Sequence, residues 1–426
     1  MRDIFIVLTT LVGVGATFAW PFAGTLLWAW FSLMSPQSEA FGFAQTLPLN
    51  LIVAVAAIGR WILSREKKLL PHDALIWLSL AFLGWCTLNS FLAVDPSWSW
   101  IYWDRTWKIF ALGFLVAIQV NSKVRLHALV WIIVVSLFYY GVKGGLFTIL
   151  SGGHSHVYGA PGTIIGDNNQ LALALLMVLP LANYLRGHSA NKWVARILML
   201  GIALTVVAVL GTYSRGGAIG LAMLAVAAWL KYRRKFSYLV LAAMIFVPAL
   251  YFMPESFYQR LHSINNYNSD ASFQGRVVAW HVAFDYARDH FPFGAGFYGP
   301  QLPQVFHIYY PYELQHAAHS IYFQVLGEQG FVGLALYLLL IAATFWRSVR
   351  LSRALKDRPQ EDLAELVSMM QLGLLVFCLS GAALSMAYYD LFVLYIGMMV
   401  AVSGQTALQT RYQRQSRTLV MAAEAA

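Results

Sequence analysis

The sequence predicts an all-α, polytopic integral membrane protein in which residues 1–426 form a single transmembrane domain. Hydrophobic residues make up 59% of the chain and charged residues only 11%, far below the quarter that is usual in soluble domains. Apolar runs of about 17 or more residues recur along the whole length, and each is long enough for a membrane helix.

We expect about twelve membrane-spanning helices. The first apolar run, residues 4–34, is too long for one straight span, and Pro21 interrupts it. Two short helices or one broken helix both fit, and the parity of the spans favours one broken helix with a cytoplasmic N-terminus. The expected spans are residues 4–34, 47–63, 74–92, 105–120, 125–150, 167–186, 193–210, 214–230, 237–253, 320–346, 366–386 and 388–406.

Lysine and arginine set the expected orientation. Basic clusters, such as those at residues 60–68, 123–125 and 347–358, alternate with loops that are poor in Lys and Arg. The positive-inside rule then places both termini in the cytoplasm and makes residues 254–319 one large periplasmic loop. The net charge of +10 is therefore mostly a topology signal, so membrane lipids and not nucleic acids are the expected partners.

Composition and motifs exclude several kinds of chemistry. The two cysteines, Cys86 and Cys378, both fall inside expected spans, so we expect no disulfide. No loop is long enough for a soluble catalytic domain. The sequence contains no glycine-rich phosphate loop and no paired-aspartate metal site, so we expect no metal and no cofactor, and any reaction should take place on the outer face.

Arginine is scarce on the predicted outer face, so each one found there is informative. Arg215 follows Ser214, which is placed to cap an inward-running helix, and two glycines follow it. A helix N-terminus combined with a guanidinium is a phosphate-binding arrangement. Arg215 is therefore a candidate diphosphate ligand, and an interfacial arginine paired with Asp167 is the alternative.

Arg276 precedes an expected helix that runs to about Arg288, and Trp280 lies four residues further on the same face. Phosphate binding by Arg276 and its stacking on Trp280 are equally good interpretations. Arg288 is adjacent to Asp289, so a local ion pair is favoured and Arg288 is only an accessory candidate. Arg260 is interpreted as a surface residue.

His319 lies at the mouth of the apolar run Ile321–Trp346. The positive end of a helix lowers the pKa of a histidine, which would keep His319 neutral and able to act as a general base. A capping or structural histidine is the alternative. His316 lies at metal-ligand spacing from His319, but two histidines without a nearby acid or cysteine cluster make a weak zinc site.

Two further segments could face a sugar. Asp167 and Asn168 open another inward-running helix, where N-capping is the favoured role and contact with sugar hydroxyls the alternative. The loop Gly294–Gly299 and the tyrosines at 309, 310 and 312 have the composition of a carbohydrate-facing loop. Enrichment of aromatic residues at the membrane interface explains them equally well.

These residues resemble the O-antigen ligase and O-antigen polymerase superfamily. The most specific match is His319-Ser320, nine residues, then Gly330-x-x-Gly333. The segments Ser214–Gly217, Gly275-Arg276 and Gly294-x-Gly296-Phe297 are similar to other parts of the family. The resemblance covers residues 160 to 400 well. The first 150 residues are similar in hydropathy only, and resemble the leading segment of β-proteobacterial and exosortase-associated ligases.

The resemblance implies inverting transfer of a glycan from undecaprenyl diphosphate to a lipid A–core sugar hydroxyl, at the periplasmic face of the bacterial inner membrane. Arg215 and Arg276 would hold the diphosphate, and His319 would deprotonate the acceptor hydroxyl without a metal or a nucleotide. An O-antigen polymerase or a protein O-glycosylation ligase with the same donor is an alternative. A lipid or polysaccharide transporter is the alternative of another class.

Overall fold

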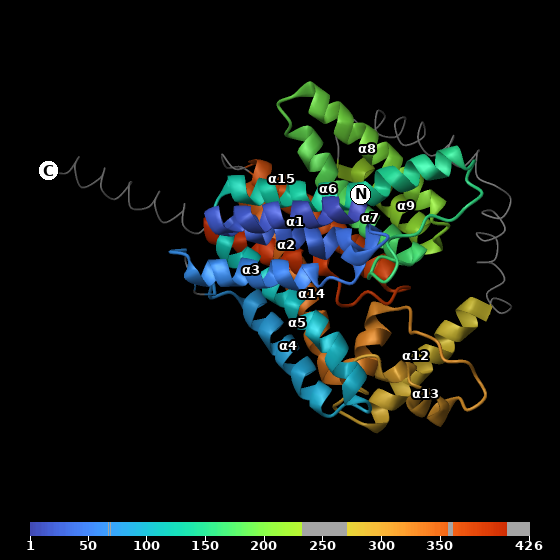
Figure 1. The fold of residues 1–426 in the computed structure, drawn as a ribbon. Coiled ribbons are helices and arrows are strands. Elements are labelled where there is room, and N and C mark those ends of the chain that lie inside the picture. Colours follow the sequence, from blue (N-terminus) through green and yellow to red (C-terminus); the bar gives the residue numbers. More distant parts are fainter. Residues whose placement is uncertain (67, 69, 232–270, 357–360, 407–426) are drawn as a thin grey trace.

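The computed structural model describes the chain except for residues 67, 69, 232–270, 357–360 and 407–426, and the described part is helical without strands (Figure 1). Among the described residues, seven helices are long and apolar enough to span a membrane, and four shorter apolar helices accompany them. The all-α class is thus confirmed, whereas the count of twelve spans stays a prediction. The expected span 237–253 and Arg260 lie outside the described residues.

The observed helices follow the expected spans closely. α5 begins well before residue 105, because Asp95 caps it by accepting hydrogen bonds from the backbone N–H groups of Ser97 and Trp98. The helices of the bundle are α1 (Arg2–Ala19), α2 (Pro21–Met34), α3 (Leu49–Leu63), α4 (Ala74–Phe91), α5 (Pro96–Gln119), α6 (Lys123–Leu150), α7 (Asn168–Gly187), α8 (Lys192–Gly211), α9 (Arg215–Lys231), α14 (Ile321–Leu355), α15 (Glu361–Gly381) and a last helix, Asp390–Thr406.

Helices α1 and α2 form an antiparallel hairpin, which corrects the expectation of one broken span. Pro21 opens α2, where its missing N–H leaves no hydrogen bond unmade. Asp3, at the start of α1, accepts a hydrogen bond from the N–H of Ala44, beyond the end of α2. At the opposite end, Arg60 Nε donates to the carbonyl oxygen of Phe18 at 2.9 Å. The N-terminus therefore lies opposite Arg60 and the basic loops, and the expectation that both termini share the basic end is wrong.

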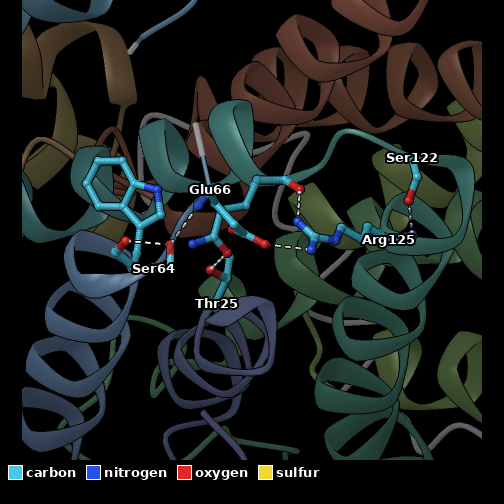
Figure 2. Close-up of polar contacts among 7 residues, drawn as sticks. Thr25, Ser64, Glu66, Ser122 and Arg125 are labelled. Atoms are coloured by element: carbon cyan, nitrogen blue, oxygen red, sulfur yellow. Dashed lines mark hydrogen bonds and ion pairs between the residues drawn. The ribbon is translucent and has the colours of Figure 1, made fainter. Parts of the chain in front are cut away.

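Arg60, Arg125 and Arg347 lie at one end of the bundle, which we call the basic end. There a polar cluster that includes Thr25, Glu66 and Arg125 ties the hairpin to the bundle (Figure 2). Arg125 Nη2 pairs with Glu66 Oε1 at 2.6 Å, and Arg125 Nη1 donates to the carbonyl oxygen of Gln119 at 2.8 Å. Thr25 of α2 donates to Gln119 Oε1 at 2.8 Å. The start of α2, the segment after α3, the end of α5 and the start of α6 thus meet, which fixes the direction of α2.

Residues 271–319, the described part of the expected periplasmic loop 254–319, are largely helical and are called the outer module below. They contain α12 (Ala271–Asp289), the short η4 (Gly299–Gln301) and α13 (Pro303–Tyr309). Ala279, Val282 and Phe306 help to form a small core of their own. In Figure 1 the module lies below the bundle, beside the lower part of α4 and α5. Its periplasmic location stays a prediction.

The outer module attaches where α14 breaks, at Gly330. Gly330 has a φ of 71°, and a Cβ at this position would lie 2.3 Å from the carbonyl oxygen of Pro292. A Cβ on Gly294 would lie 2.5 Å from the backbone nitrogen of Gly330. The N–H of Gly296 donates to the carbonyl oxygen of Glu328 at 3.0 Å. The glycines of residues 294–296 and Gly330 therefore allow the two backbones to approach closely. The sequence analysis interpreted the Gly294–Gly299 loop as facing a sugar or the membrane interface, and did not include this packing role.

Candidate functional site

His319 is held against both the bundle and the outer module. It directly precedes Ser320, the N-cap residue of α14, and has a left-handed backbone with a φ of 43°. Its backbone N–H donates to Ser385 Oγ at 2.9 Å. The preceding carbonyl oxygen, that of Ala318, accepts a hydrogen bond from Trp280 Nε1 at 2.6 Å. The side chain of His319 is half-buried in this corner.

The surroundings of His319 favour its neutral form. Burial lowers the pKa of His319 most, and the positive charges of Arg276 and of protonated His316 lower it further, whereas Asp167 raises it. The direction agrees with the prediction from sequence, and burial is the leading cause. At neutral pH the imidazole is therefore uncharged and able to accept a proton.

Arg276 and His316 are brought together at the start of α12. A Cβ on Gly275 would lie 2.8 Å from Nε2 of His316, so the imidazole packs on bare backbone next to the half-buried Arg276. The Trp280 ring is stacked on Phe323, with ring centroids 5.0 Å apart and an angle of 6° between the planes. Trp280 therefore forms one of the contacts between α12 and α14.

Helices α7 and α9 begin at the same end of the bundle as α14. Asp167 caps α7, and Ser214 Oγ caps α9 by accepting a hydrogen bond from the N–H of Gly217 at 3.0 Å. Both expected N-caps are thus confirmed. Asn168 Nδ2 donates to the carbonyl oxygen of Thr212 at 2.7 Å. Asn168 therefore braces the start of α7 against the turn that leads into α9.

Arg215 is the first residue of α9 and is half-buried. Ser380 Oγ, at the end of α15, donates to the carbonyl oxygen of Gly216 at 3.3 Å. A Cβ on the neighbouring Gly381 would lie 2.9 Å from the side chain of Ile321, the first residue of α14. α9 and α14 thus begin on two sides of the end of α15. Helix starts that lie at one end of the bundle, one of them carrying an arginine, suit a phosphate-containing ligand.

Arg288 lies outside this group. It pairs with Asp285 at 3.0 Å and with Asp289 at 2.9 Å on the exposed side of α12. At the rise of a helix it is about 18 Å from Arg276 along α12. The local pair with Asp289 that the sequence favours is confirmed, and the geometry gives no support to an accessory role at the diphosphate.

The zinc interpretation of His316 and His319 also has no support from the geometry. In the part of the chain that the structure describes, no group of three or more His, Cys, Asp or Glu side chains is placed to hold a metal ion. The arginine charge that acts on His319 is that of Arg276.

Two polar residues of α14, Gln324 and Glu328, are missed by the sequence interpretation. Glu328 is buried, and its carboxylate accepts a hydrogen bond from the hydroxyl of Tyr388 at 2.8 Å. Gln324 Oε1 accepts the N–H of Ala387 at 3.1 Å. The sequence did contain a signal for Glu328, because an acid inside an apolar helix is costly unless it has a partner. Both residues hold the segment 382–389 between α15 and the last helix.

Comparison with protein families divides the chain in two. Residues 200–338, which include Arg215, Arg276 and His319, match the family described as O-antigen ligase. This segment is therefore similar to the O-antigen ligase superfamily. Residues 1–190 match a family of unknown function, DUF5935. No curated protein matches the chain.

The match of residues 200–338 to this family supports an enzyme that transfers glycans in the manner of a ligase or polymerase. Together with the apolar helices, it supports a multi-pass membrane protein. Of the residues that surround His319, Arg276 and His316 belong to the matched segment. Asp167 precedes that segment in the sequence, and Ser385 follows it.

Proposed function

We propose that this protein is an O-antigen ligase that transfers a glycan from undecaprenyl diphosphate to a sugar hydroxyl of lipid A–core. The proposal rests on one observation above all. A half-buried histidine with a lowered pKa lies beside Arg276, at the end of the bundle where α7, α9 and α14 begin. A neutral base next to a cationic surface is what attack by a hydroxyl and departure of a diphosphate require.

In the proposed reaction, His319 accepts the proton of the acceptor hydroxyl as its oxygen attacks the anomeric carbon of the donor sugar. The bond from the anomeric carbon to the diphosphate oxygen breaks on the opposite side, so the configuration inverts. Undecaprenyl diphosphate leaves with the electron pair of that bond. Arg215 and Arg276 stabilise the negative charge that grows on it. The transfer needs no metal and should continue in excess chelator.

The proposed orientation of the protein in the membrane follows from the arginines at the basic end of the bundle. Arg60, Arg125 and Arg347 lie there, and the positive-inside rule assigns that end to the cytoplasm. His319 and the outer module then face the periplasm from the inner membrane. A reporter placed near Lys356 should be cytoplasmic and one at the N-terminus periplasmic. The same compartment for both would overturn this orientation.

Lipopolysaccharide gels of a deletion strain test the function. Loss of a ligase leaves bare lipid A–core while the undecaprenyl-linked glycan accumulates. Core that carries single glycan units indicates a polymerase, and unchanged lipopolysaccharide with unglycosylated proteins indicates a protein O-glycosylation ligase. Purified protein that joins the glycan to lipid A–core in detergent excludes a transporter, because transport forms no covalent bond.

A further inference from the structure

The peptide unit between Ala318 and His319 is held from both sides. Its carbonyl oxygen accepts a hydrogen bond from Trp280 Nε1 at 2.6 Å, and its N–H donates to Ser385 Oγ at 2.9 Å. Trp280 belongs to α12, whereas Ser385 belongs to the segment 382–389. Two elements that are far apart in the sequence therefore grip one peptide plane, which we call the 318–319 clamp.

The backbone of His319 needs such a hold. A φ of 43° lies in the left-handed region, which is unfavourable for a residue with a Cβ unless the surroundings enforce it. The orientation of the 318–319 peptide plane sets this φ angle. Without the clamp the backbone would relax, and the imidazole would leave its place near Arg276 and Asp167.

Both arms of the clamp are anchored on the first turns of α14. The ring of Trp280 is stacked on Phe323. The segment that carries Ser385 is fastened by the hydrogen bonds of its backbone and of Tyr388 to side chains of α14. Because His319 directly precedes α14, these contacts close a ring around it.

We propose that Ser385 and Trp280 are positioning residues that hold His319, through its backbone, in the orientation that faces the acceptor hydroxyl. The inference rests on the proposed function, in which His319 is the base. Neither residue acts on the reacting atoms. Their loss should therefore lower turnover without abolishing it, and should leave binding of the donor unchanged.

The test uses the full chain in lipid vesicles, with an undecaprenyl diphosphate-linked glycan as donor and lipid A–core as acceptor. Ser385→Ala removes the acceptor of the clamp. Trp280→Phe removes the indole N–H but keeps a ring against Phe323. Each variant loses one hydrogen bond, so kcat should fall about threefold to tenfold while KM for the donor stays unchanged.

The pH profile provides a second measurement. His319 faces Arg276 and His316 of the outer module and Asp167 of α7. An imidazole that leaves this buried place beside Arg276 regains a more ordinary, higher pKa. The acid limb of the kcat profile should therefore move to higher pH in both variants. A serine that only supports folding would not produce this shift.

Two matched variants complete the test. Ser385→Thr keeps the hydroxyl and should restore both kcat and the acid limb. Ser348→Ala removes another buried hydroxyl, which donates to the carbonyl oxygen of Phe345 at 2.6 Å near the basic end, and should change neither.

Normal kcat and a normal acid limb in Ser385→Ala and Trp280→Phe would overturn the inference. A fall in kcat without a shift of the acid limb would overturn it too, since that result indicates a structural role only. The proposed function fails separately if His319→Ala keeps normal turnover.

Discussion

The two ends of the bundle use charge differently. At the basic end, arginines are bound to acids from other elements: Arg125 to Glu66 and Arg347 to Asp73, each at 2.6 Å. At the opposite end, a histidine with a lowered pKa lies in a strained backbone beside an arginine. Charges neutralised by a partner fasten helices together, whereas a neutral base kept beside a cation is suited to chemistry. Variants at the two ends should therefore fail in different ways.

The largest effect is expected for His319→Ala. General-base loss typically lowers turnover by about 10²–10⁴-fold. The loss should fall on kcat and not on donor affinity, because the proton is removed only in the transition state. Single-turnover transfer and donor binding by the purified variant measure the two quantities.

The matched control for His319→Ala is His188→Ala at the basic end, where the ring of His188 bonds to the carbonyl oxygen of Tyr184 at 3.0 Å. Its turnover per folded molecule should be close to normal. If both histidine variants lose turnover equally, the division between the two ends is wrong.

Arg276→Ala and Arg215→Ala come next. Removing a charged donor that stabilises a transition state typically lowers the rate about 10²–10³-fold. Lysine should rescue either position poorly, since a point charge replaces a planar fork of donors. Arg288→Ala is the control, because Arg288 is exposed and paired with Asp289. Near-normal transfer by either of the first two variants would mean that the diphosphate is bound elsewhere.

A smaller effect is expected on the pH profile. The neutral imidazole is the active form, so the rate should be constant above the pKa of His319 and fall below it. Burial and Arg276 lower that pKa from the ordinary value of 6.5, so the midpoint of the fall should lie below pH 6.5. Asp167→Asn removes a charge that raises the pKa and should move the limb to lower pH. His316→Ala should move it slightly higher.

Shifts of the same sign in Asp167→Asn and His316→Ala would contradict this electrostatic account. A limb that does not move in either variant would show that the titrating group is not His319.

Much of the fold could be predicted from local patterns. Hydropathy placed most helix ends within a few residues, and short-range chemistry predicted the caps Asp167 and Ser214, since a cap depends only on its own turn. The motif around His319 is also local, and the segment that matches the family, residues 200–338, contains it. Its partners Arg276, His316 and Asp167 were already candidates, although sequence could not show that they meet.

What the sequence could not predict depends on contacts between distant segments. Hydropathy fits a broken helix and a hairpin equally well, and the contact between Asp3 and Ala44 decides for the hairpin. Gly294 and Gly330 resembled parts of two separate motifs until the structure showed that they pack on each other. Ser385 lies in a short segment with no motif, and only the hydrogen bond to His319 distinguishes it.

The smallest effect on turnover is expected at the basic end, for Arg347→Ala. Arg347 Nη1 contacts Asp73 Oδ2 at 2.6 Å and Ser403 Oγ at 3.0 Å. The side chain of Asp73 is only 11% exposed, so the variant leaves a largely buried carboxylate without its cation. This should lower the free energy of unfolding by about 1–3 kcal/mol, seen as a lower midpoint of thermal unfolding in detergent.

Adding Asp73→Asn to Arg347→Ala should recover part of that stability, because the double variant buries no unpaired charge. Asparagine can also keep the N-cap of α4, where Asp73 Oδ1 accepts the N–H of Leu75 at 2.9 Å. Turnover per folded molecule should stay within about twofold of the wild type in both variants, since sites this far apart behave independently. A tenfold loss of turnover in correctly folded Arg347→Ala would show that the basic end does more than fasten helices, and would end the distinction between the two ends.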